Sequence, residues 1–174
     1  MIRHKNKAAA FLGWLLILVL LFLIALVFLP CYKVLSISGR KNPAEVYYSH
    51  SACKNGFVIS YTHSVNKGRV HDHYSIDSAD NLVLNKTVFV SYGAGIPEPE
   101  ETPGAIFTHT EDGYEISNID RSSKQFVMAV GIIANHSITV NEKEYFLTDY
   151  FEPQTSLILE IKRISFVQYI LKKL

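Results

Sequence analysis

The chain has 174 residues, of which 48% are hydrophobic and 19% charged, and its formal net charge at neutral pH is +1. This balance excludes a nucleic-acid-binding protein that relies on overall positive charge. The apolar and aromatic residues that run through the whole length exclude a disordered chain. Residues 1–30 hold three of the 17 basic residues and none of the 16 acidic ones, so the rest of the chain is mildly acidic. That remainder, residues 31–174, has the size of one domain.

The first element is an apolar run of 22 uncharged residues, 8–29, which ends at Pro30. As a helix it would be about 33 Å long, enough for a hydrocarbon core of about 30 Å. The apolar core of a signal peptide is usually shorter, and no small-residue cleavage site follows the run. A lipoprotein signal ending at Cys31 would need small residues where Leu29 and Pro30 stand. We therefore expect residues 8–30 to be an uncleaved transmembrane anchor.

The charges on either side of this segment predict its orientation. Residues 1–7 carry three basic side chains, which favour the cytoplasmic side of the membrane. The segment that follows the helix also contains basic residues, so the bias is modest. We expect residues 1–7 to form a cytoplasmic tip and residues 31–174 an extracytoplasmic domain, anchored in the cytoplasmic membrane by a single pass.

The chain has two cysteines, Cys31 and Cys53, and both fall on the expected outer side. A disulfide between them would be compatible with an oxidising compartment. Its geometry is not readable from the sequence, so the sequence leaves the bond open.

Beyond residue 32 the pattern is that of short strands, with alternating or continuous apolar residues between turn signals. The apolar run 126–133 is typical of a strand covered on both faces. The tail, residues 165–174, is either a short amphipathic helix or one more strand. The expected fold is all-β, an antiparallel sandwich or a partly open barrel. Its expected strands are residues 34–38, 57–65, 70–76, 82–92, 105–110, 114–119, 126–133, 138–140, 145–147 and 157–164.

One segment, residues 91–104, is rich in glycine, proline and glutamate and reads SYGAGIPEPEETPG. Glycine permits close backbone approach, and proline stiffens the chain. Two interpretations stay open: an exposed acidic crossover, or a shaped loop that touches a ligand or partner.

The strands on either side of residues 66–69 predict a hairpin. A two-residue turn at residues 67–68 would place His63 opposite Asp72 on the apolar, core-facing side. A histidine and an acid on an inward face are costly unless they pair. The favoured interpretation is a buried hydrogen bond that fixes the register, and the alternative is a polar spot inside a ligand pocket.

Catalytic and metal-binding patterns are weak. His71 and His73 share a strand face, but a zinc site needs three or four ligands, and solvated histidines are the favoured interpretation. Ser64 adjoins His63 but points to the opposite face, so the two cannot act as nucleophile and base. We find no nucleophile elbow, phosphate-binding loop or dinucleotide fingerprint in the sequence. We therefore expect a protein that is not an enzyme and that has no cofactor and no metal.

Three motifs together resemble domain-of-unknown-function family 1850 of bacteria. They are His63-Ser64-Val65, then Val70-x-Asp72-x-Tyr74, then the Ser-Tyr-Gly-Ala-Gly-Ile-Pro segment of residues 91–97. The likeness extends over about residues 35–165. This sequence has Tyr61, Arg69 and Asp72 where many members have Trp, Pro and Glu. The residues carried over as a hypothetical ligand or partner site are His63, Ser64, Asp72, Ser91, Gly93, Ala94, Gly95 and Pro97.

The resemblance also implies a setting for the domain. Members of the family have no established activity, and they are typically encoded beside TRAP transporters of the TAXI subtype, which import organic acids with an extracytoplasmic binding protein. It implies an accessory protein that contacts the membrane and either the multi-spanning permease or the substrate-binding protein, with no nucleic-acid partner. The alternative is a stand-alone module that binds or senses a small ligand in the cell envelope.

Overall fold

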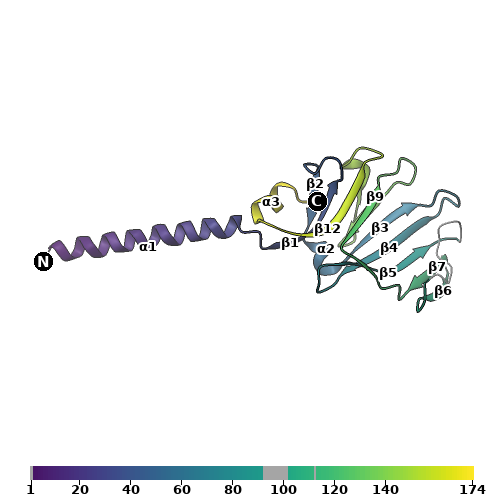
Figure 1. Ribbon diagram of the computed structural model, residues 1–174, viewed down its shortest axis with the longest axis horizontal. Helices are drawn as coiled ribbons and strands as arrows, with labels where there is room; N and C mark the ends of the chain where they lie inside the picture. The colour runs from purple at the N-terminus through teal and green to yellow at the C-terminus, as the bar shows by residue number, and fades with distance from the viewer. Residues whose placement is uncertain (1, 92–101, 112) are drawn as a thin grey trace.

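The computed structural model describes residues 2–91, 102–111 and 113–174, which form one long helix followed by a β-rich body (Figure 1). The helix α1 (Ile2–Phe28) projects away from the body, and its segment Phe11–Phe28 is uniformly apolar with none of it buried. By length and composition this helix can cross a membrane as an anchor or serve as a signal sequence. Three residues, 29–31, separate it from the first strand.

The body is built from two antiparallel sheets, which confirms the predicted sandwich. The four-stranded sheet has the order β2 (Val46–Ser49), β1 (Tyr32–Gly39), β12 (Ser156–Ile164), β9 (Gln125–Ala129). The larger sheet has the order β11 (Lys143–Phe146), β10 (Ser137–Val140), β3 (Phe57–Thr62), β4 (Arg69–Ile76), β5 (Leu82–Phe89), β7 (Gly113–Ser117), β6 (Ile106–Thr110), and β8 (Arg121–Ser123) also pairs with β5. Two short helices, α2 (Ser51–Asn55) and α3 (Phe166–Leu171), and a 3-10 turn at Leu147–Asp149 complete the body.

The main core lies between the sheets, because alternate side chains of each strand point inward. It contains fully buried residues from β1, β12, β3 and β10, among them Leu35, Leu159, Ile59 and Ile138. A side chain of this size contributes roughly 1.5–3 kcal/mol when it is fully buried. A second, smaller cluster on the larger sheet consists of Val70, Phe89 and Ile116.

Strand β1 is buried on both faces, and one of its residues is a buried serine without a partner. Ser36 is 0% exposed, and its hydroxyl has no hydrogen-bond partner among the described residues. A buried polar group left unpaired costs about 1–3 kcal/mol relative to water.

We therefore expect Ser36→Ala to raise the free energy of unfolding by about 1 kcal/mol, measured by urea denaturation. Ser137→Ala is the matched control, because Ser137 is equally buried but bonds to Arg69 and Glu144. Removing that hydroxyl should lower stability, and an equal loss in both variants would contradict the prediction for Ser36.

The expectation that residues 126–133 form a strand covered on both faces is wrong. Strand β9 ends at Ala129 and lies at the edge of the four-stranded sheet, and β12 is its one partner among the strands that the structure describes. Val127 is 44% exposed, and the last two residues of the apolar run, Ile132 and Ile133, are 65% and 75% exposed in the following loop.

The other predicted strands are present, although several begin or end a few residues from the expected bounds. Of the two interpretations of the tail, the helical one is confirmed by α3. Strands β2 and β8 and helix α2 were not predicted.

Cys31 and Cys53 are free thiols, and burial raises the pKa of Cys53 to about 11.

Candidate functional site

The hairpin of β3 and β4 has a wider loop than the sequence suggested. Tyr61 lies opposite Val70 and Ile59 lies opposite Asp72, so the predicted two-residue turn and the pairing of His63 with Asp72 are wrong. The backbone N–H of His63 donates to the carbonyl oxygen of Gly68 at 2.8 Å and closes a six-residue loop. The observed register differs from the predicted one by four residues, an even number, so the apolar side chains keep their inward face.

His63 lies in this loop and organises it from within. Its side chain is almost fully buried, and ring atom Nδ1 accepts the backbone N–H groups of Val65 at 3.2 Å and Asn66 at 3.4 Å. Two donors directed at Nδ1 hold the imidazole in the tautomer with its proton on Nε2. His63 therefore acts first as an internal cap of the loop, while Ser64 beside it is exposed.

Asn66 connects this loop to the third family motif, which begins at Ser91. Its amide Nδ2 donates to the carbonyl oxygen of Ser91 at 2.7 Å, and its Oδ1 accepts from the N–H of Gly68 at 2.9 Å. Sequence reasoning missed Asn66, although an asparagine two residues before a glycine is a recognised turn signal. Ser91 is therefore placed beside the His63 loop. The predicted site residues Gly93, Ala94, Gly95 and Pro97 lie outside the described residues.

Because of these two hydrogen bonds, Asn66→Ala should lower the free energy of unfolding by about 1–2 kcal/mol. It should also speed hydrogen exchange at the amide of Gly68, which loses its acceptor. The control is Asn55→Ala, which removes an exposed side-chain bond to Asn141 and should change stability by less than about 0.5 kcal/mol. Equal effects in the two variants would contradict the role assigned to Asn66.

Asp72 occupies a separate position, on the core-facing side of β4. Thr87 on β5 donates its hydroxyl to Asp72 Oδ1 at 2.8 Å. Burial raises the pKa of Asp72 to about 6, and the Thr87 hydrogen bond opposes this rise only in part. Burial, with the nearby Asp72 charge adding to it, also raises the pKa of Tyr61 to about 12. Asp72 lies level with Ile59, so about 13 Å of strand separates it from the position of His63.

The His63 loop and the loop after β9 lie at one end of the sandwich, and we call their exposed apolar side chains the distal face. It consists of the exposed side chains Val65, Ile132 and Ile133, which are 67%, 65% and 75% exposed. An open cleft of about 420 Å³ lies here, and Thr62, Ser64, Lys67, Ile132, Ile133 and Ala134 contribute to its lining. The N–H of Thr62 donates to the carbonyl oxygen of Ala134 at 2.6 Å and joins the two loops.

The register of the four-stranded sheet places the distal face away from α1. Strand β1 begins at Tyr32, next to α1, and ends at Gly39, which lies opposite Leu157. The neighbouring Ser156 lies opposite Ala129, the last residue before the loop that carries Ile132 and Ile133. In Figure 1 the loops between β3 and β4 and after β9 accordingly lie at the end of the body away from α1.

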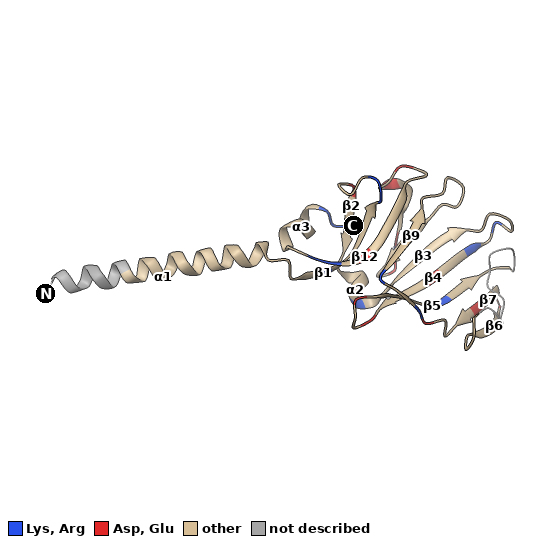
Figure 2. Ribbon diagram, viewed as in Figure 1, with Lys and Arg blue, Asp and Glu red and all other residues tan. Residues whose placement is uncertain are grey.

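The outer face of the larger sheet carries polar side chains that pair with one another. Ser60 bonds to Nδ1 of His71 at 2.8 Å, and Arg69 binds Glu144 at 3.0 Å. Burial, followed by the charge of Arg69, lowers the pKa of His71. Ser60 is only 2% exposed, so its hydroxyl is poorly accessible to a substrate. Figure 2 shows basic and acidic residues interspersed over the body.

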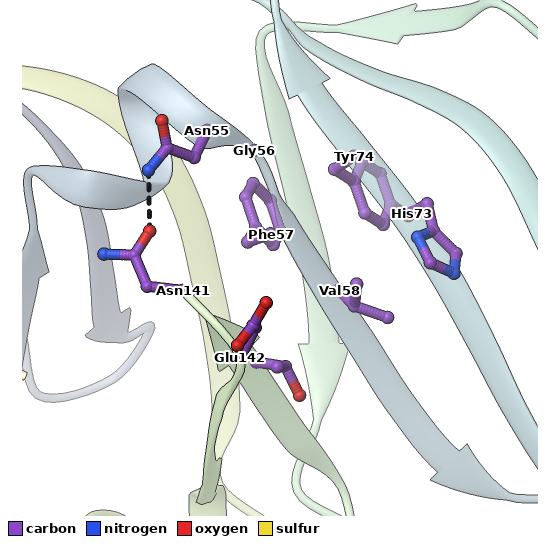
Figure 3. Close-up of a pocket in the computed structure, with 9 residues that line it drawn as sticks. Asn55, Gly56, Phe57, Val58, His73, Tyr74, Asn141 and Glu142 are labelled. Atoms are coloured by element: carbon purple, nitrogen blue, oxygen red, sulfur yellow. Dashed lines mark hydrogen bonds between the residues drawn. The ribbon is translucent and has the colours of Figure 1, made fainter.

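A second depression of about 450 Å³ lies beside α2, and Figure 3 shows its walls. Asn55 on α2 donates to Oδ1 of Asn141 at 2.7 Å on one side of it, while Glu142 and His73 stand on other sides. Its polar groups would suit a small polar molecule, but none of the predicted site residues lines it. Among the residues that the structure describes, no group of three or more His, Cys, Asp or Glu side chains is arranged to hold a metal ion.

The comparisons with known proteins identify the chain only at the level of a family. No curated protein and no solved structure matches it. Residues 57–147, more than half of the chain, match the family described as domain of unknown function DUF1850. The match runs from β3 to β11 and contains the His63 loop, Asp72, Ser91 and the loop of Ile132 and Ile133. The chain therefore belongs to the DUF1850 family.

Proposed function

We propose that this chain is a membrane-anchored, extracytoplasmic accessory protein of a TRAP transporter of the TAXI type, which imports organic acids. In this proposal residues 8–30 are the uncleaved anchor, residues 1–7 stay in the cytoplasm and the body lies outside. The chain binds a partner and does not catalyse a reaction. The family resemblance supports the transporter setting, and the apolar helix α1 supports the anchor.

The observation that carries the proposal is the distal face. At this face the His63 loop, which is bonded to Ser91, is also bonded to the loop that carries the exposed side chains Ile132 and Ile133. Exposed apolar patches with polar rims mark protein contact sites more often than isolated surface residues do. The hydrogen bonds of His63 and Asn66 fix the loop before a partner arrives, which reduces the entropy cost of binding.

The partner would be the multi-spanning permease or its substrate-binding protein. An anchored body presents the distal face away from α1, on the side of the membrane where substrate arrives. The permease can meet that face with its extracytoplasmic loops, and the binding protein can meet it directly.

The test is co-purification of the full chain from cross-linked native membranes, with identification of the polypeptides that accompany it. Val65→Asp and Ile133→Asp should each reduce the recovered transporter polypeptide at least tenfold. The matched control is Ile106→Asp, because Ile106 is 59% exposed on β6. Repeated recovery without any transporter polypeptide, or equal losses with the control variant, would refute the proposal.

A second candidate function is a stand-alone module that binds or senses a small ligand. The observation in its favour is Asp72, a half-buried carboxyl group whose pKa is raised to about 6 beside Tyr61. A panel of organic acids should then raise the melting temperature of the wild-type chain. His63→Ala and Asp72→Asn should weaken that rise, and unchanged rises in both variants would rule the candidate out.

A further inference from the structure

The C-terminal helix α3 is fixed firmly on the body. Ser165 caps its start, since its Oγ accepts the N–H of Gln168 at 3.2 Å and Gln168 Oε1 accepts the N–H of Ser165 at 3.0 Å. Tyr169, only 8% exposed, packs against Val34 and Ile164. The orientation of α3 is therefore set by packing on one side and by a capping box at its start.

The tail after α3 is also attached to the body. The N–H of Tyr48 on β2 donates to the carbonyl oxygen of Lys172 at 2.8 Å, and the N–H of Leu174 donates to that of Tyr48 at 3.0 Å. Helix α3 is therefore held on the body at both ends. The side of the helix opposite Tyr169 stays exposed in the folded state.

That other side is apolar. Phe166, Ile170 and Leu171 are 47%, 57% and 73% exposed. Phe166 and Ile170 are four residues apart, so they lie on the same side of the helix. We call these three side chains the outer face of α3. Lys172 and Lys173, both exposed, follow directly.

The outer face lies where α1 leaves the body. Helix α3 contacts α1, and Figure 1 shows α3 at the end of the body from which α1 projects. Tyr32 is the first residue after the connection 29–31. The centroid of its ring lies 5.9 Å from the ring centroid of Phe166 and 4.9 Å from that of Tyr169. Tyrosine and other aromatic rings gather at the level of lipid headgroups in membrane proteins.

We propose that the outer face of α3 lies in the interfacial layer of the bilayer that α1 crosses, with lipid as its occupant. This inference rests on the proposed anchor. Residues 29–31 span at most about 10 Å, which keeps α3 close to the depth at which α1 leaves the hydrocarbon core. An apolar helix face of this kind enters the boundary between headgroups and acyl chains, while Lys172 and Lys173 reach the lipid phosphates.

The test uses the full chain reconstituted in vesicles of phosphatidylcholine and phosphatidylglycerol. In a background of Cys31→Ser and Cys53→Ala, a fluorophore is attached through Leu171→Cys or, as the matched control, through Ile133→Cys. The two positions are 73% and 75% exposed but lie at opposite ends of the body. Spin-labelled lipid should quench the fluorophore at position 171 several times more strongly than at position 133.

A second variant and a second reporter guard against local misfolding. Ile170→Glu should reduce quenching at position 171 and leave the signal at position 133 unchanged. Because Trp14 is the only tryptophan in the chain, Trp14→Phe combined with Phe166→Trp gives a reporter without a label. Its emission should be quenched by the same lipid.

The outcomes separate this inference from the anchor. Loss of the chain from the vesicles under alkaline extraction would refute the anchor itself. A chain that resists extraction but shows equal quenching at positions 171 and 133 would overturn the inference alone. Protection of position 171 from both water and lipid quencher in native membranes would show that a protein covers the outer face, and would overturn it too.

Discussion

Asp72→Asn is expected to stabilise the folded domain at neutral pH by about 1–3 kcal/mol. Burial raises the pKa of Asp72 from 3.8 to about 6, so the folded state favours the protonated carboxyl more than the unfolded state does. One pKa unit corresponds to about 1.4 kcal/mol, and partial exposure reduces the full effect. Asparagine carries no charge and still accepts the hydrogen bond from Thr87.

The pH dependence of this effect has a definite sign. The contribution of Asp72 to stability is fully present below pH 3.8, and it is lost as the pH rises through about 6. Urea denaturation across this range should show a gap between the variant and the wild type that widens with pH. A constant gap between about pH 4 and about pH 7 would contradict the assignment.

Asp77→Asn provides a control of opposite sign. Hydrogen bonds from Asn81 lower the pKa of the Asp77 carboxyl group. Its contribution is present above the unfolded pKa of 3.8 and is lost as the pH falls further. The asparagine variant should therefore lose stability relative to the wild type, and only above the folded pKa of Asp77.

Gly56→Ala is expected to lower the free energy of unfolding by about 3 kcal/mol or more. Gly56 joins α2 to β3 with a φ of +76°, and a Cβ added there would lie 2.4 Å from the carbonyl oxygen of Tyr74. That oxygen belongs to β4, the partner strand of β3, so relief of the clash must disturb the paired strands. Backbone strain at such a φ adds about 1–3 kcal/mol to the clash.

Gly104→Ala separates the two causes. Gly104 has a φ of +87°, but a Cβ there would meet nothing within 4 Å. In the same denaturation experiment this variant should lower the free energy of unfolding by only about 1–2 kcal/mol, the cost of a positive φ without a clash. Equal losses at Gly56 and Gly104 would mean that the contact with Tyr74 has no effect.

The sandwich could be predicted because most of its strands carry alternating apolar residues, which fix the inward face. The register of β3 and β4 could not, since it depends on loop closure by side chains. Asn66 and His63 satisfy backbone N–H groups within a six-residue loop, and the spacing of apolar residues is the same for a shorter turn. Strand β2 escaped prediction because its sequence, Val-Tyr-Tyr-Ser, lacks the alternation of apolar and polar residues that marks a strand.

The candidate site could be predicted only in part, for a related reason. His63 was identified from the predicted hairpin and again, with Ser91, from the family resemblance, but the connection of the two through Asn66 is visible only in three dimensions. Ile132 and Ile133 were predicted to extend a buried strand, because an apolar run has the same composition in a core and on a surface. Their exposure follows from the end of β9 at Ala129, which no local pattern marks.

The place of β1 in the fold has a mechanical consequence. This strand follows α1 after three residues and pairs with β12 on one side through eight residue pairs and with β2 on the other. A pull between α1 and the distal face therefore acts along β1, perpendicular to the hydrogen bonds that hold it. Such a load is shared by the whole ladder at once instead of opening it one bond at a time, so β1 resists tension between α1 and the distal face.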